Sequence, residues 1–96
     1  MKMQVMVVYA RWCPICNMMK PMLEEVFEDF ETMLEVDWVD VDSHPEAYEQ
    51  YEVEVIPTLI CYCEGDEVVR MAGMIGERNL RERIKKNACI SKQSNI

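Results

Sequence analysis

The sequence predicts an α/β fold, with a four-stranded mixed sheet that carries helices on both faces. Apolar runs rich in β-branched residues alternate with stretches whose apolar residues recur at helical spacing. The order of these segments is β-α-β-α-β-β-α. The first two strands are joined by a helix and should therefore be parallel, with a right-handed crossover. The last two are joined by a glycine-containing turn and should form a hairpin.

The first half of the chain contains a strand, a long helix and a second strand. Met3 to Tyr9 is almost continuously apolar, which suits a strand buried on both faces. A helix begins at Pro14, because the first turn of a helix does not need the N–H that proline lacks. Its apolar residues continue at helical spacing to Phe30, and Leu34 to Val41 forms the second strand.

The second half contains a short helix, a hairpin and a final helix. In order, these elements are a capping turn over 42–45 with a helix to about Tyr51, a strand over Thr58 to Cys63, a turn over 64–67, a strand over Val68 to Ala72, and a helix over Glu77 to Asn87. We expect one domain over residues 1–90, followed by a polar tail over 91–96.

Composition narrows the function. The 96 residues are half hydrophobic and carry a net charge of -8. This acidity argues against a nucleic-acid partner or an anionic membrane surface. No apolar run approaches the ~20 residues that a membrane span needs, and the N-terminus lacks a cleavage site typical of a signal peptide. We therefore expect a cytoplasmic protein, and a monomer.

The two cysteines in Trp12-Cys13-Pro14-Ile15-Cys16 are the most informative feature. The pair follows a strand and opens a helix, where amide groups and the helix dipole favour a thiolate. A thiolate is the species that attacks disulfides, so this placement predicts redox chemistry.

The other three cysteines are expected to be unpaired thiols, because an odd count without regular spacing is a poor disulfide framework. Cys61 and Cys63 share one face of their strand and should pack in or near the core. Cys89 should be an exposed thiol near the end of the last helix. The alternative is a zinc site in which Cys61 and Cys63 join the first pair. Strand geometry puts Cys61 about 13 Å from Pro57, too far for a tetrahedral site, so we expect no metal.

Several further residues carry a resemblance to the thioredoxin superfamily, which covers Met3 to Lys86. Trp12-Cys13-x-x-Cys16 ends the first strand, as the family's active site does. The other matching positions are Pro21 in the following helix, Ile56-Pro57-Thr58 for the loop with a cis proline, Gly65 in the hairpin and Gly73 opposite the redox pair. The resemblance implies a minimal thioredoxin-like fold that begins at thioredoxin's second strand.

The chain departs from the thioredoxin pattern at three places. Pro14-Ile15 stands where thioredoxins have Gly-Pro, and Cys-Pro-x-Cys is the glutaredoxin arrangement. The segment after Pro57 nevertheless lacks the glycine pair and acidic residues with which glutaredoxins hold glutathione. Val7 and Trp38 replace the buried acid and its lysine partner, which removes the group expected to take the proton of Cys16.

The resemblance implies a thiol–disulfide oxidoreductase that reduces protein disulfides. We expect Cys13 to be the nucleophile and the more exposed of the pair, with Arg11 favouring its thiolate. Cys16 should resolve the mixed disulfide. Because Pro14 is glutaredoxin-like, we expect a less reducing potential than the roughly -270 mV of thioredoxin.

No bound cofactor is expected, since the disulfide is recycled by an external donor, either a thioredoxin reductase or glutathione. Disulfide-containing proteins should dock on a platform around the pair. Its expected members are Trp12, Pro14, Ile56, Pro57, Gly73 and Met74. Two alternatives stay open: a glutathione-linked, glutaredoxin-like redoxin, and a binding or sensor module in which the disulfide switches affinity for a partner.

Overall fold

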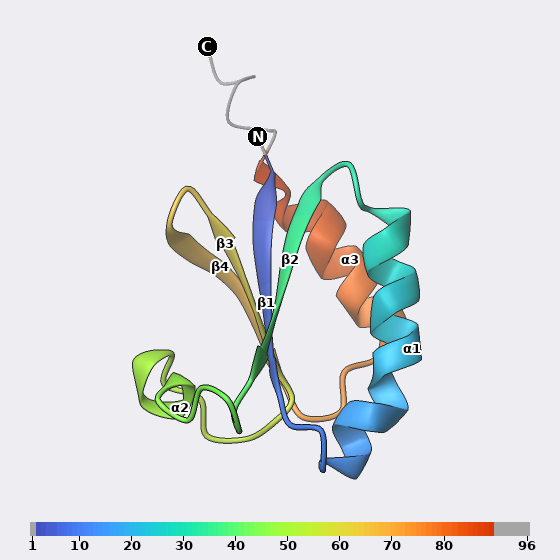
Figure 1. Ribbon diagram of the computed structural model, residues 1–96. Helices are drawn as coiled ribbons and strands as arrows, with labels where there is room; N and C mark the ends of the chain where they lie inside the picture. The colour runs from blue at the N-terminus through green and yellow to red at the C-terminus, as the bar shows by residue number, and fades with distance from the viewer. Residues whose placement is uncertain (1, 90–96) are drawn as a thin grey trace.

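The computed structural model describes residues 2–89 and contains seven elements (Figure 1). They are β1 (Met3–Tyr9), α1 (Pro14–Asp29), β2 (Leu34–Asp40), α2 (Ala47–Gln50), β3 (Thr58–Cys63), β4 (Asp66–Ala72) and α3 (Glu77–Asn87). The predicted order of elements is confirmed. The proposed tail over 91–96 lies outside the described residues.

The four strands form one mixed sheet in the order β2-β1-β3-β4. β1 lies parallel to β2, with Tyr9 opposite Asp40 at their ends. β3 runs antiparallel to β1 and pairs with β4 as a hairpin. The carboxyl ends of β1 and β2 therefore meet at the same edge as the start of β3, and the Cys13–Cys16 segment follows directly from this edge.

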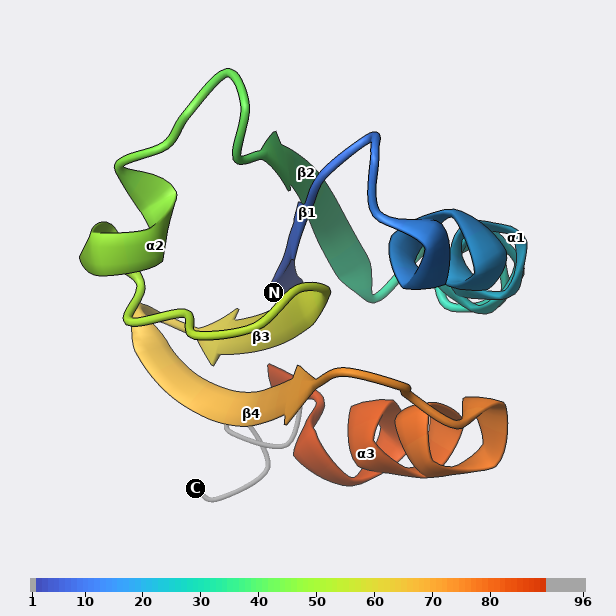
Figure 2. The same ribbon diagram turned by 90° about the horizontal axis from the view of Figure 1, so that it is seen from below.

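The two long helices pack side by side on one face of the sheet, and the short α2 lies on the other (Figure 2). The main core lies between the sheet and α1 and α3. Its innermost side chains, each at most 2% exposed, are Met3, Val5, Val7, Leu23, Val26, Leu59, Cys61, Val69, Leu80, Ile84 and Cys89. A smaller cluster on the second face includes Val8, Val41 and Ile60 together with Cys13 and Cys16.

The predicted ends of two elements were wrong. The β3–β4 turn has only two residues, Glu64 with φ 54° and Gly65 with φ 86°, so β4 already begins at Asp66. Two consecutive positive φ angles match the right-handed twist of the flanking strands and allow this tight connection. α2 spans only four residues, and its N-cap residue, Glu46, makes no side-chain hydrogen bond to the helix.

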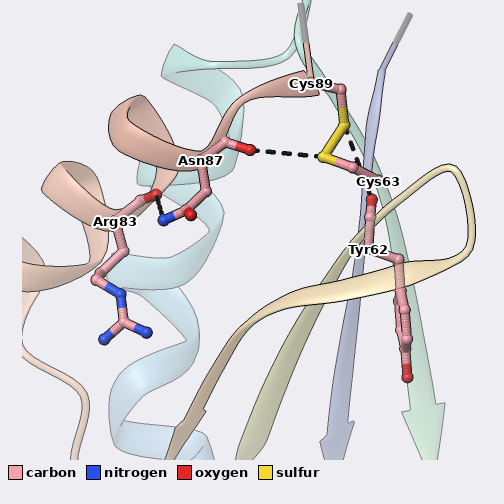
Figure 3. Close-up of a disulfide and its surroundings, with 5 residues drawn as sticks. All are labelled: Tyr62, Cys63, Arg83, Asn87 and Cys89. Carbon is pink, nitrogen blue, oxygen red and sulfur yellow. Dashed lines mark hydrogen bonds between the residues drawn. A yellow bond between two sulfur atoms is a disulfide. The ribbon is translucent and has the colours of Figure 1, made fainter. Parts of the chain in front are cut away.

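Two cysteines expected to be free are joined in a disulfide. Cys63, the last residue of β3, is bonded to Cys89, two residues beyond α3. Cys89 is 2% exposed, so the expected exposed thiol was also wrong. The bond forms because α3 runs back along the sheet and ends beside the far end of β3 (Figures 1 and 3). Cys61 is buried and free, as expected.

Within the described residues, none of the helices combines the length and apolar character that crossing a membrane requires.

Removal of the Cys63–Cys89 disulfide should lower the free energy of unfolding by about 3 kcal/mol, because the bond closes a loop with a sequence separation of 26 residues. Urea unfolding of the Cys63→Ala/Cys89→Ala variant measures this loss. Cys63→Ala alone should lose nearly as much, since either change removes the bond. A double variant within 1 kcal/mol of the parent would contradict the stabilising role.

Candidate active site

The Cys13–Cys16 pair forms the first turn of α1. Cys13 occupies the N-cap position with extended backbone angles, and Pro14 follows in the first turn. The Cys16 amide donates to the Cys13 sulfur at 3.2 Å. The sulfur thus satisfies one of the amide groups that a helix start leaves unpaired, and it lies where negative charge is favoured.

The two thiols differ in their chemical setting and hardly in their exposure. Cys13 is 5% exposed and Cys16 is 6% exposed, so the expectation that Cys13 is the more exposed was wrong. Burial, and then the side-chain hydrogen bond with Cys13, raise the pKa of the Cys16 thiol to about 11. Cys16 therefore keeps its proton at neutral pH.

Arg11 is paired with a carboxylate. Its Nε lies 3.3 Å from Oδ2 of Asp40, whose side chain is 11% exposed. Since the carboxylate offsets part of the positive potential of Arg11, the charge next to Cys13 is weaker than the sequence suggests. The Arg11 carbonyl also accepts a hydrogen bond from the Asn17 side chain at 2.9 Å, which ties this loop to α1.

Trp12 is 62% exposed, and its indole N–H donates to Asp42 at 3.1 Å. The sequence analysis missed Asp40 and Asp42. A signal was available, because parallel strands place their carboxyl ends at one edge: Asp40 ends the strand that runs beside β1, and Asp42 follows two residues later. Together they hold the loop that carries Arg11 and Trp12.

Of the other residues expected to form the substrate-docking platform, some lie beside the redox pair and some do not. The Ile56–Pro57 bond is cis, as the resemblance implied. The Gly73 amide donates to the Pro57 carbonyl at 2.8 Å, with φ 76° at Gly73. Ile56 packs against the cluster that contains both redox cysteines. Met74 is 67% exposed, but it lines a separate cavity beside α3.

A cavity of about 250 Å³ lies beside Cys16 and Pro57. Val7 and Trp38, the two replacements noted in the sequence, are part of its wall. The described residues that line it include no carboxylate. The Trp38 ring meets Tyr9 edge-on at 5.7 Å between ring centroids, and the Lys20 ammonium lies 5.7 Å from the Trp38 ring centroid. Arg11 and Lys20 are the cationic side chains among the described residues that line this cavity.

The alternative of a zinc site, in which Cys61 and Cys63 would join the first cysteine pair, is not favoured by the geometry. Cys63 is consumed by its disulfide, so its sulfur is not a thiolate ligand in this state. Over residues 2–89, no group of three or more His, Cys, Asp or Glu side chains is arranged to hold a metal ion.

We expect iodoacetamide to modify Cys13 before the other two free thiols, Cys16 and Cys61, near pH 7 in protein whose Cys63–Cys89 disulfide is intact. Cys16 has a pKa of about 11, and burial raises that of Cys61 to about 12, so both stay protonated. Peptide mapping after brief alkylation measures the order. First modification at Cys16 or Cys61 would contradict the assignment, and Cys13→Ser should abolish the fast reaction.

The sequence model of the thioredoxin family matches residues 1–86. A thioredoxin from Staphylococcus aureus is 38% identical over 79 residues, which cover 82% of this chain and 76% of that protein. The crystal structure of Fasciola hepatica thioredoxin matches with a TM-score of 0.79 at 33% identity, covering 88% of this chain and 80% of that one. The germline-specific Drosophila thioredoxin Deadhead matches with a TM-score of 0.81 at 27% identity, with coverage of 88% and 80%.

These similarities extend over the sheet, the long helices and the segment that holds Cys13 and Cys16, and the chain accordingly belongs to the thioredoxin family of thiol–disulfide oxidoreductases.

Proposed function

We propose that the chain reduces disulfides in other proteins, with Cys13 as the nucleophile and Cys16 as the resolving thiol. The hydrogen bond from the Cys16 amide to the Cys13 sulfur carries this assignment, because it places a helix N-terminal donor against Cys13, while burial raises the pKa of the Cys16 thiol to about 11. No prosthetic group takes part, and the dithiol itself supplies the electrons.

In the first step the Cys13 thiolate attacks one sulfur of the substrate disulfide. The substrate S–S bond breaks, the other substrate sulfur leaves as a thiolate and takes a proton, and a mixed disulfide forms. Cys16 then loses its proton and attacks the Cys13 sulfur. The second substrate thiol is released, and the Cys13–Cys16 disulfide has taken the place of the substrate's bond.

The proposed docking surface for a substrate protein is the exposed apolar surface around Trp12. Ile56, Pro57 and the backbone of Gly73 support it, because they border the redox pair. Pro14 is exposed in the first turn of α1, within reach of a bound partner. We assign Met74 to the outer edge of this surface, since its side chain lines a different cavity.

The donor that reduces the Cys13–Cys16 disulfide is proposed to be a thioredoxin reductase. The absence after Pro57 of the glycine and acidic residues that hold glutathione supports this choice over glutathione. The cytoplasmic location, the monomeric state and the less reducing potential stay predictions.

A second candidate function is redox sensing, and the cavity beside Cys16 favours it. No carboxylate is among the described residues that line this cavity, so the proposed acceptor of the Cys16 proton is water, for which a volume of about 250 Å³ has room. Slow resolution would prolong the mixed disulfide and hold a partner covalently.

We expect the protein to reduce insulin with NADPH and thioredoxin reductase, and to do so much more slowly with glutathione and glutathione reductase. Turbidity of the precipitating insulin chains measures both rates. Cys13→Ser should abolish activity, whereas Cys16→Ser should accumulate a mixed disulfide on Cys13. Cys61→Ala is the matched control, since Cys61 is buried away from the site.

Activity with glutathione alone would favour the redoxin alternative. Inactivity with both donors and with dithiothreitol would favour the sensor.

The resolution step should accelerate about tenfold per pH unit between pH 7 and 9. Below its pKa of about 11, the thiolate fraction of Cys16 rises tenfold per unit. With Ellman's reagent, Cys13 releases the first thionitrobenzoate and resolution by Cys16 releases the second, so stopped-flow absorbance separates the two steps. Val7→Asp, which supplies a carboxylate, should flatten this profile. A pH-independent second release in the parent protein would contradict the role of water.

A further inference from the structure

The Cys63–Cys89 disulfide is set among polar backbone atoms at the far end of the sheet (Figure 3). The Cys63 sulfur lies 3.5 Å from the carbonyl oxygen of Asn87, and the Cys89 sulfur lies 4.0 Å from that of Tyr62. A disulfide sulfur has no proton to donate, so these are contacts in the oxidised state. In the reduced state, each thiol would find a hydrogen-bond acceptor already in place.

The disulfide borders a cavity of about 280 Å³. This volume is enough for a small molecule of amino-acid size. The described residues that line it are Cys63, Asp66, Val68, Lys86, Asn87, Ala88 and Cys89. Among these described residues, the ionised side chains are one ammonium, from Lys86, and one carboxylate, from Asp66.

The two cysteine residues are not equally exposed. The exposed fraction is 8% for Cys63 and 2% for Cys89. A thiolate that enters the cavity would therefore reach Cys63 more readily. The opposite charges of Lys86 and Asp66 complement a thiol that carries a carboxylate and an ammonium group.

We propose that Cys63–Cys89 is a second thiol–disulfide exchange site, whose reductant is a low-mass thiol of amino-acid type that bears both charges. The small thiolate attacks the Cys63 sulfur, the Cys63–Cys89 bond breaks, and Cys89 leaves as a thiolate and takes a proton from solvent. A second small thiolate attacks the outer sulfur of the Cys63 adduct. Cys63 is released as a thiol, and the two small thiols have become one small disulfide.

The fold is suited to exchange without unfolding. Both cysteines belong to the main apolar core, whose other members hold α3 against the sheet without the disulfide. The last turn of α3 has its own bond, from the Asn87 side chain to the Arg83 carbonyl at 2.8 Å, which does not involve sulfur (Figure 3).

The site is separate from the active site, since Thr58 and Cys63 lie at opposite ends of β3, roughly 17 Å apart at about 3.3 Å per residue. The inference therefore does not depend on the proposed function.

The test uses the full chain with Cys13→Ser/Cys16→Ser, so that only the second site can react. The oxidised protein is treated with four small thiols: cysteine, with both charges; 3-mercaptopropionate, with the carboxylate alone; cysteamine, with the ammonium alone; and 2-mercaptoethanol, with neither. Acid quenching and peptide mass spectrometry locate the adduct, and rates are compared per thiolate. We expect an adduct on Cys63 and the highest rate with cysteine.

Lys86→Gln should slow cysteine and 3-mercaptopropionate about two- to fivefold, as expected for one exposed charge pair, and leave 2-mercaptoethanol unchanged. Lys85→Gln is the matched control, because Lys85 neighbours Lys86 in α3 but lines a different cavity. Equal rates for all four thiols, an adduct on Cys89, or reduction only in denaturant would each overturn the proposal.

Discussion

The hydrogen bond from the Cys16 amide to the Cys13 sulfur is the contact around which the rest of the site is arranged. It requires α1 to begin at Cys13, immediately after β1 leaves the sheet. The Cys13 amide donates back to the Ala10 carbonyl at 3.2 Å, so the connection is short and closed. Because β2 runs parallel to β1, its acidic end arrives at the same place and binds Arg11 and Trp12. The sheet order thus determines which side chains surround the sulfur.

Val7 and Trp38 stand where thioredoxins have a buried acid and its lysine partner, so a proton acceptor is replaced by apolar packing. A buried ion pair often contributes no more to stability than well-packed apolar groups of similar volume. Val7 is 1% exposed, and the Trp38 ring packs edge-on against Tyr9 and Phe27. The core gains apolar contact at this position, while the thiol beside it has no carboxylate in the described cavity wall to accept its proton. A separate feature of β2 is its position at the edge of the sheet. Its exposed charges, Glu35 and Asp37, oppose pairing of this edge with a strand of another chain.

Most of the fold could be predicted from hydrophobic patterning. The bounds of β1, β3 and α3 match the sequence prediction, because each is a compact apolar or helical-period run between turn residues. The two-residue turn could not be foreseen, since nothing in the sequence marks Glu64 for a positive φ. The redox pair could be predicted from its spacing, but its charged surroundings depend on strand register. The Cys63–Cys89 bond depends on where α3 ends in space, which an odd number of cysteines obscures.

The redox-active pair Cys13 and Cys16 lies at one end of the sheet and the Cys63–Cys89 disulfide at the other, which affects how the protein's redox state can be measured. With the Cys63–Cys89 bond intact the chain has three free thiols among its five cysteines, and one of them, Cys61, is buried. A midpoint obtained from total thiol content would therefore average two couples with unrelated surroundings. The indole of Trp12 lies next to one pair only, so its fluorescence offers a signal that can follow Cys13–Cys16 separately. Thiol counting would then report on both cysteine pairs, whereas Trp12 fluorescence would report on Cys13 and Cys16.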